Sequence, residues 1–358
     1  MQNLSNSAAP RAVKVVAMGG GTGLSTLLHG LKQYVTAAGE ARLPDMLPRI
    51  DDLSAIVTVS DDGGSSGRLR KELNVPAPGD VRNCIVALSE DEALLSRLFQ
   101  YRFPAGEGLG GHNFGNLFLS AMTAIAGDFS QAVKHSSEIL ATRGHIYPAT
   151  TSNAQLYAIM DDGSVVRGET NITASQRRIV ELRMAPANAK PLPVALAAIE
   201  SADLITIGPG SLFTSLAPNL LVRNVSQAIA TSRAVKVFVC NLMTQANESL
   251  GLTASDHIRA LYKHARRQFF DYALVNRTPA SPALALKYAE KQQSQIETDV
   301  DAIEALGVKP IVGEYLVEKV DSREGLVARH DTHRVAHDLL QLMVELRESP
   351  VTTLQRER

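Results

Sequence analysis

The chain has 358 residues, of which 45% are hydrophobic, and its net charge is −1. This apolar content excludes an intrinsically disordered chain, and the near-zero charge argues against general attraction to nucleic acid or to an anionic membrane. No apolar run reaches the 18 residues of a membrane-spanning helix, so we expect no membrane span.

Apolar runs alternate with amphipathic segments along the chain. Residues 1–12 are small and polar, and we expect a disordered tail. Residues 13–18 predict a buried strand, and the leucines that follow recur at helical spacing. Further strands are expected at 55–60, 203–207, 234–240 and 272–275, with a hairpin turn at 161–163. We expect residues 13–346 to form a single domain and the charged residues 347–358 to fray.

This alternation is typical of an α/β fold. We predict a Rossmann-like, doubly wound and mostly parallel sheet with helices on both faces. Ligands of such sheets bind beyond the carboxyl ends of the strands, so polar clusters that follow strands are candidate sites. Four clusters follow predicted strands, and we expect them to converge on one rim.

The first cluster joins the first strand to the first helix. Its glycines let a phosphate approach the backbone, and the N–H groups of the helix N-terminus can bind it. It differs from the NAD fingerprint because Thr26 replaces the third glycine and the usual acidic residue is absent. No Gly-Lys-Ser/Thr follows, which excludes a Walker A loop. A tight turn without a ligand is the alternative. The candidate ligand-binding residues are Gly20, Gly21, Thr22, Gly23 and Leu24.

The second cluster, SDDGGSSGRLR at 60–70, contains two adjacent carboxylates. Asp61 and Asp62 can hold Mg²⁺ together with substrate phosphates, or one of them can bind a ribose hydroxyl. We expect residues 63–67, including Ser65 and Ser66, to form a flexible loop that closes over a ligand. Arg68 can pair with a phosphate. The alternative is a solvated Asp-Gly turn, and Mg²⁺ is not a certain cofactor.

The third and fourth clusters follow the strands at 203–207 and 234–240. Glycines in the third permit close backbone approach, and Ser211 is a candidate helix N-cap. Amide and hydroxyl groups in the fourth can recognise a base or a sugar. An ordinary capped helix start is the alternative for the third cluster. The candidate ligand-binding residues are Gly208, Pro209, Gly210, Ser211, Asn241 and Thr244.

Other polar segments give weaker signals. Asp80 is a candidate helix N-cap, and His112 is either a general acid–base group or a structural loop histidine. Cys84 and Cys240 form no C-x-x-C pair, and the N-terminus lacks the apolar segment of a signal peptide. We therefore expect a cytoplasmic protein. Tryptophan is absent and aromatic residues make up 5% of the chain, which argues against a nucleic-acid-binding platform.

Seven motifs resemble the gluconeogenesis-factor (YvcK-like) family of the CofD-like superfamily, in the expected order between residues 13 and 343. The motifs are GGTGLS (20–25), SDDGGSSG (60–67), PGDVRN (78–83), GGHNFGN (110–116), IGPGSLFTS (207–215), NLMTQ (241–245) and RHD (329–331).

The resemblance implies a Rossmann-like core that binds a UDP-sugar of the UDP-N-acetylglucosamine type. It also implies a regulatory role in growth on gluconeogenic carbon sources and in cell shape and wall synthesis. By similarity, the Gly-rich loop and Asp61 and Asp62 lie at the ligand, while Tyr288 and Arg329 contact the UDP-sugar. The superfamily's namesake uses Mg²⁺ to transfer 2-phospho-L-lactate to a deazaflavin precursor.

Two functions therefore remain open. The first is a UDP-sugar-binding regulatory protein without turnover. The second is a Mg²⁺-dependent, 2-phospho-L-lactate transferase-like enzyme acting on a nucleotide-linked substrate, in which Asp61 and Asp62 hold the metal and Arg68 steadies developing charge. The low aromatic content favours the first, because a deazaflavin needs a broad aromatic cleft. We also expect a homo-oligomer, and a regulatory protein partner remains open.

Overall fold

The computed structural model describes residues 12–35, 47–90, 92–104, 106, 108–175, 177–321 and 324–348. The tail expected over 1–12 lies outside these residues except for Ala12. Of the expected C-terminal tail, only residues 347 and 348 lie among the described residues. Both continue the last helix, α14 (Thr332–Glu348).

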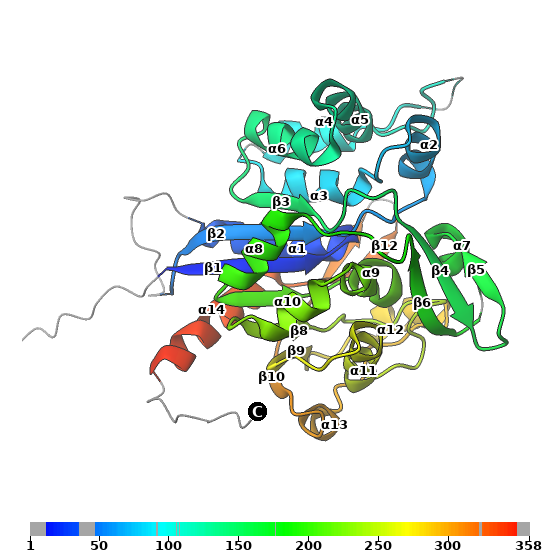
Figure 1. The fold of residues 1–358 in the computed structure, drawn as a ribbon. Coiled ribbons are helices and arrows are strands. Elements are labelled where there is room, and N and C mark those ends of the chain that lie inside the picture. Colours follow the sequence, from blue (N-terminus) through cyan, green and yellow to red (C-terminus); the bar gives the residue numbers. More distant parts are fainter. Residues whose placement is uncertain are drawn as a thin grey trace, which may run out of the picture.

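A seven-stranded sheet forms the centre of the molecule, and every neighbouring pair in it is parallel. The chain builds one half of the sheet outward from β1 and then returns to build the other half, so β1 and β7 adjoin in the middle (Figure 1). This arrangement confirms the Rossmann-like α/β prediction. The strand order is β10 (Lys309–Gly313), β9 (Tyr272–Asn276), β8 (Val235–Val239), β7 (Leu204–Ile207), β1 (Val13–Gly19), β2 (Ile50–Val57) and β3 (His145–Pro148).

Both faces of the sheet are buried, which explains why its strands read as continuous apolar runs. In β1, Val16 and Met18 belong to one core cluster, whereas Val15 and Ala17 belong to the other. The first cluster includes side chains of α8 (Pro193–Ser201), α9 (Ala217–Leu221), α10 (Val225–Thr231), α11 (Ala254–Ala265) and α13 (Val300–Glu304). The second includes α1 (Gly21–Leu31), α3 (Gly79–Leu88) and α14.

Further helices gather beyond the β3 edge of the sheet (Figure 1). Phe99 packs edge-on against Phe118, with ring centroids 5.2 Å apart, and joins α4 to α5. The helices of this group are α2 (Gly64–Leu73), α4 (Glu92–Gln100), α5 (Phe114–Ala126) and α6 (Phe129–Ile139). The helical start of α2 corrects the expectation of a flexible loop over 63–67.

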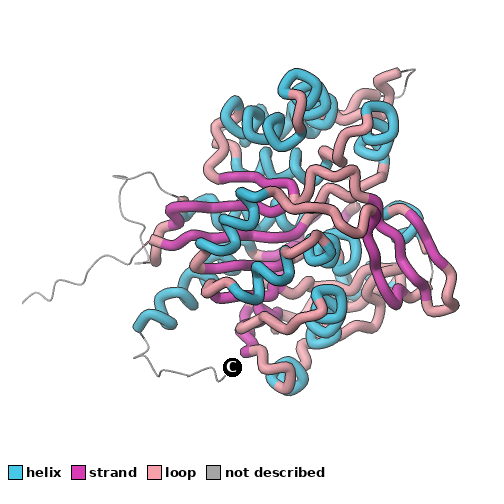
Figure 2. The backbone as a smooth tube through the Cα atoms, viewed as in Figure 1, coloured by secondary structure: helices cyan, strands magenta, loops and turns pink. Residues whose placement is uncertain are grey.

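Two small antiparallel sheets accompany the central sheet, and Figure 2 shows the three-stranded one in magenta beside the carboxyl ends of the central strands. The first has the order β5 (Val165–Arg167), β4 (Gln155–Met160) and β6 (Ile179–Ala185), and the turn between β4 and β5 confirms the predicted hairpin at 161–163. The second pairs β11 (Leu316–Asp321) with β12 (Gly325–His330). Shorter elements are η1 (Lys32–Tyr34), α7 (Glu169–Ala174), the π-helix η2 (Leu212–Leu216) and α12 (Pro282–Ala289).

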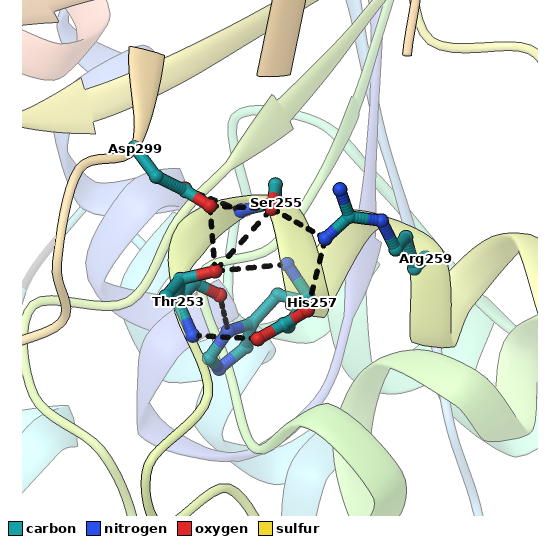
Figure 3. Close-up of polar contacts among 6 residues, drawn as sticks. Thr253, Ser255, His257, Arg259 and Asp299 are labelled. Atoms are coloured by element: carbon teal, nitrogen blue, oxygen red, sulfur yellow. Dashed lines mark hydrogen bonds and ion pairs between the residues drawn. The ribbon is translucent and has the colours of Figure 1, made fainter. Parts of the chain in front are cut away.

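The N-terminus of α11 is fixed by a network of hydrogen bonds (Figure 3). Thr253 and Asp256 form a capping box, in which each side chain bonds the backbone N–H of the other residue. The carboxylate of Asp299 accepts hydrogen bonds from the Thr253 hydroxyl at 2.7 Å and from the Ser255 N–H at 2.9 Å. Arg259 donates to the Ser255 hydroxyl at 2.7 Å. These contacts set the direction of α11 and so the position of its C-terminal end.

Within the described part of the chain, none of the helices combines the length and the apolar character needed to cross a bilayer.

Candidate functional site

A cavity of about 680 Å³ opens where β1, β7 and β8 end. The strand order reverses between β1 and β7, and open α/β sheets bind their ligands at such a switch point. The loops after these three strands form one side of the cavity, and α12 and the β11–β12 hairpin form the other. Three of the four predicted clusters therefore meet on one rim.

The Gly-rich loop forms the floor of this cavity. Gly20, Gly21, Thr22 and Gly23 line it, whereas Leu24 is fully buried in the core below. Gly21 has φ +61°, a conformation that glycine adopts most easily, and it is the first residue of α1. A side chain at Gly23 would overlap the carbonyl of Pro209, so this glycine is required by contact between two loops. The first turn of α1 contributes backbone N–H groups and positive potential.

A carboxylate that the sequence did not mark as a ligand contact lies directly below the loop. Asp80 accepts a hydrogen bond from the N–H of Gly21, and burial raises the pKa of its carboxyl group to about 6. The prediction that Asp80 caps its helix is corrected, because Pro78 holds the N-cap position and Asp80 lies in the first turn of α3. The proximity of Asp80 to Gly21 spans about 60 residues of sequence, so no local pattern could reveal it.

The loops after β7 and β8 are fastened to each other. Asn241 accepts from the N–H of Gly210 at 2.9 Å and donates to its carbonyl at 2.7 Å. Gln245 donates to the Ser211 hydroxyl at 2.9 Å, and the Thr244 hydroxyl accepts from the N–H of Ser294 at 2.9 Å. These side chains line the cavity together with Pro209, and their hydrogen bonds hold its shape. Gly208 is buried behind them and does not line the cavity.

Cationic side chains line the opposite wall. Arg329 of β12 and Tyr288 of α12 both line the cavity, and the Tyr288 hydroxyl accepts from the N–H of Ala328 at 3.2 Å. Lys287 and Lys291 join them, although sequence reasoning missed both. Lys287 is next to Tyr288 in the sequence, and Lys291 follows Lys287 by four residues. This spacing was the signal that could have predicted them. Lys287 donates to the backbone carbonyls of Glu324 and Leu326.

His330 ties this wall to the central sheet. Its Nε2 lies 3.0 Å from the carbonyl oxygen of Cys240 at the end of β8. Burial lowers the pKa of the imidazole to about 4, so the ring is neutral at pH 7 and donates this hydrogen bond. The hairpin carrying Arg329 is therefore anchored to the strand that precedes Asn241.

The second predicted cluster lies outside the lining of this cavity. Ser65 and Ser66 are buried in the first turn of α2, where their hydroxyls lie 3.2 Å from His112 Nδ1 and from Asn116 Nδ2 respectively. Arg68 donates to the carbonyl of Gly110 at 2.8 Å. These three side chains therefore bond to the loop before α5 and to α5 itself. His112 is itself buried, with a lowered pKa caused first by desolvation, and it fits the structural alternative.

Asp61 and Asp62 both have hydrogen-bond partners within the protein. Asp62 accepts from the N–H groups of Glu169 and Thr170 at 3.0 and 2.8 Å, and from the Thr170 hydroxyl at 2.7 Å. Asp61 accepts from the N–H of Gly63 at 2.8 Å. Among the described residues, no group of three or more His, Cys, Asp or Glu side chains could hold a metal ion. A Mg²⁺ site built on both carboxylates would share Asp62 with the hydrogen bonds that cap α7.

Glu169 completes an acidic group beside the loop. Burial, and then the charges of Asp61 and Asp80, raise the pKa of the Glu169 carboxyl to about 9. Glu169 is therefore protonated at pH 7, because ionisation would add another negative charge to a partly desolvated site. Sequence reasoning missed this residue, which follows a short strand of the β4–β6 sheet.

Comparisons with known proteins agree on one family. A family model described as 2-phospho-L-lactate transferase CofD matches residues 15–316. A protein of Bacillus subtilis named "Gluconeogenesis factor" is 44% identical over 332 residues, which cover 93% of this chain and 98% of that protein. A "Putative gluconeogenesis factor" of Nostoc is 47% identical over 92% of this chain and 68% of its own length. The crystal structure of a UPF0052-family protein from Bacillus halodurans superposes with a TM-score of 0.83 at 44% identity, covering 92% of this chain and 99% of that one.

Proposed function

This chain belongs to the gluconeogenesis-factor family within the CofD family, and on that premise we propose that it is a UDP-sugar-binding regulatory protein. The ligand would be of the UDP-N-acetylglucosamine type and would occupy the cavity between β1 and β7. Binding of this ligand would regulate growth, cell shape and wall synthesis on gluconeogenic carbon sources.

One observation carries the proposal: the Gly-rich loop faces a cationic wall across a cavity of about 680 Å³. A diphosphate can bind the N–H groups at the start of α1 on one side and Arg329, Lys287 or Lys291 on the other. The volume falls within the range of small-ligand sites, about 300–1,000 Å³. The mostly polar lining suits a base and a sugar, whose hydroxyl and amide groups need hydrogen-bond partners.

Calorimetric titration with UDP-N-acetylglucosamine, with and without Mg²⁺, tests this function. We expect saturable binding of one ligand per chain, and chromatography after overnight incubation should recover the ligand intact. Absence of binding would refute the proposal. In cells, a deletion strain should grow poorly and lose its normal shape on gluconeogenic carbon sources, and the wild-type chain should restore both.

A second candidate function is the Mg²⁺-dependent, 2-phospho-L-lactate transferase-like activity that the family description suggests. The raised carboxyl pKa values of Asp80 and Glu169 favour it, because perturbed pKa values are typical of catalytic sites. A protonated Glu169 could act as a general acid. Mg²⁺-dependent consumption of a nucleotide-linked substrate in the same chromatography would establish this activity and overturn the view of a protein without turnover.

We further propose that the protein acts in the cytoplasm as a homo-oligomer and reports to a protein partner. Both cysteines are free and buried, as expected in a reducing compartment. Leu94 and Leu98 of α4, 66% and 43% exposed, supply an apolar surface for association. Cell fractionation and light scattering on the purified chain test the first two statements, and crosslinking in cells tests the third.

A further inference from the structure

A second cavity lies away from the Gly-rich rim. Its volume is about 550 Å³, and it shares no lining residue with the first cavity. Strand β6, the turn between α9 and α10, and the C-terminal end of α11 enclose it. Figure 1 shows these elements together on the side of the β4–β6 sheet. The function proposed above does not use this cavity.

The cavity is strongly cationic. Its lining contains Arg183, Arg223, Lys263, Arg266 and Arg267, against a single carboxylate, Glu181. That carboxylate is already paired with one of the five cations, since Arg183 donates to its two oxygens at 2.9 and 3.0 Å. Lys263 donates to the backbone carbonyl of Val180 at 2.7 Å.

Three guanidinium groups of this lining have no charge partner among the described residues. Over the described ranges of the chain, the side chains of Arg223, Arg266 and Arg267 make no hydrogen bond or ion pair. Lys263 and Arg266 lie near the C-terminus of α11, where the helix dipole favours cations. That effect does not account for Arg223, which follows α9 and reaches the same cavity from another part of the chain.

The floor of the cavity is apolar, unlike its rim. Met184, Leu220, Val222 and Ala265 are buried there, and Tyr157 is half-buried at the edge. Arginine binds phosphate through paired N–H groups, and an apolar floor accepts the ring of a small molecule. The volume of about 550 Å³ falls within the range of small-ligand sites, about 300–1,000 Å³.

The two cavities share a wall. Phe213 of η2 packs edge-on against His264 in the lining of the second cavity, with ring centroids 5.6 Å apart. The N–H of Phe213 donates to the carboxylate of Glu248, which lines the first cavity, at 3.0 Å. His264 is held in turn, because its Nε2 accepts from the N–H of Leu182 at 2.9 Å.

We propose that this second cavity is a binding site for a small phosphorylated molecule, held through Arg223, Arg266 and Arg267. The site is distinct from the cavity at the strand ends and does not depend on what that cavity binds.

The probe is inorganic tripolyphosphate, titrated calorimetrically into the full-length protein. This protein carries Arg329→Ala, which weakens phosphate binding in the first cavity. We expect one saturable site. Adding Arg223→Gln or Arg267→Gln should weaken its affinity by at least about tenfold, the usual loss of a charge-assisted hydrogen bond. The matched control is Arg233→Gln, an exposed arginine outside both cavities, which should leave the affinity unchanged.

Arg223, Arg267 and Arg233 are solvent-exposed, so thermal unfolding should show that each change leaves the Arg329→Ala protein folded. Equal affinity in the Arg223→Gln, Arg267→Gln and Arg233→Gln proteins would overturn the proposal, as would the absence of a saturable site. Tighter binding of a hexaglutamate peptide than of tripolyphosphate would overturn it in favour of an acidic protein segment.

Discussion

Asn241 and Gly210 exchange two hydrogen bonds, one at 2.9 Å and one at 2.7 Å, across the ends of two neighbouring strands. The side-chain amide of Asn241 thereby bonds both the N–H and the carbonyl of Gly210, as the backbone of a neighbouring strand does in a sheet. The loop that carries Pro209 and Ser211 is fixed at the mouth of the first cavity by this pair.

Asn241→Ala should remove both hydrogen bonds. We expect the free energy of unfolding to fall by about 1–3 kcal/mol and UDP-sugar affinity to fall by about tenfold, because the loop loses its support. Urea unfolding and calorimetry measure the two effects. Asn171→Ala, which removes one exposed hydrogen bond in α7, is the control and should retain full affinity. Unchanged binding in Asn241→Ala would show that the ligand does not contact this loop.

Arg329→Ala should weaken UDP-sugar binding by about 1.5–3 kcal/mol, the contribution of a hydrogen bond to a charged group. Its control is Arg334→Ala on α14, which removes an exposed ion pair with Asp338 and lies outside the cavity. Calorimetry compares the two variants. Equal affinities would remove Arg329 from the ligand site.

Gly21→Ala should reduce UDP-sugar affinity sharply. The new methyl group would lie 3.4 Å from the Ser215 hydroxyl inside the cavity, and φ +61° adds backbone strain of about 1 kcal/mol. Gly163→Ala carries similar strain at φ +81° in the exposed β4–β5 turn, where no atom lies within 4 Å. Both variants should lose similar stability, but only the first should lose binding. Retained affinity in Gly21→Ala would place the phosphates elsewhere.

The stability of the protein should depend on pH through Glu169. Its pKa is raised from 4.5 to about 9 in the folded state, so between these values the folded chain keeps a proton that the unfolded chain releases. Folding is therefore progressively disfavoured as pH rises through this window. Glu169→Gln removes the effect and should gain stability over the wild type between pH 5 and 8.5, as measured by urea unfolding. Parallel curves for the two proteins would mean that Glu169 ionises normally.

Asp62→Ala separates a structural role from a role at the ligand. Loss of the three hydrogen bonds that cap α7 should cost about 1–2 kcal/mol of stability. Because Asp62 does not line the cavity, we expect UDP-sugar affinity to change less than about twofold, which is below 0.5 kcal/mol. A large loss of affinity in a stable variant would instead support the ligand and metal contact suggested by its place in the SDDGGSSG motif.

The sequence predicted features that depend on local pattern. The strand before Gly19, the helix after it and the turn at 161–163 follow from hydrophobic periodicity and glycine positions. Residues 64–67 were misjudged because Gly-Ser-Ser-Gly is poor helix-forming sequence, and tertiary contacts of Ser65 and Ser66 with the α5 region offset that preference.

The charged groups around the loop could not be predicted in the same way. Asp80, Glu169 and Lys287 come from segments more than 80 residues apart, and only the folded chain brings them near Gly21 or across the cavity from it. Only the family resemblance pointed to Arg329 and Tyr288, since nothing in their local sequence indicates a ligand. The second cavity likewise brings together Arg223 and Arg267, which no short motif connects.

The single wall formed by η2 has a consequence for genetic analysis of this protein. Phe213 packs against His264 through its ring and donates to Glu248 through its backbone N–H, so a substitution that shifts η2 would act on both cavities and its phenotype could not be attributed to either. Suppressors selected against such a change could arise at either cavity and would mimic a direct interaction between distant residues. Alleles meant to separate the two cavities should therefore be made at their rims, because Arg329 lines the first cavity and not the second, whereas Arg223 lines the second and not the first.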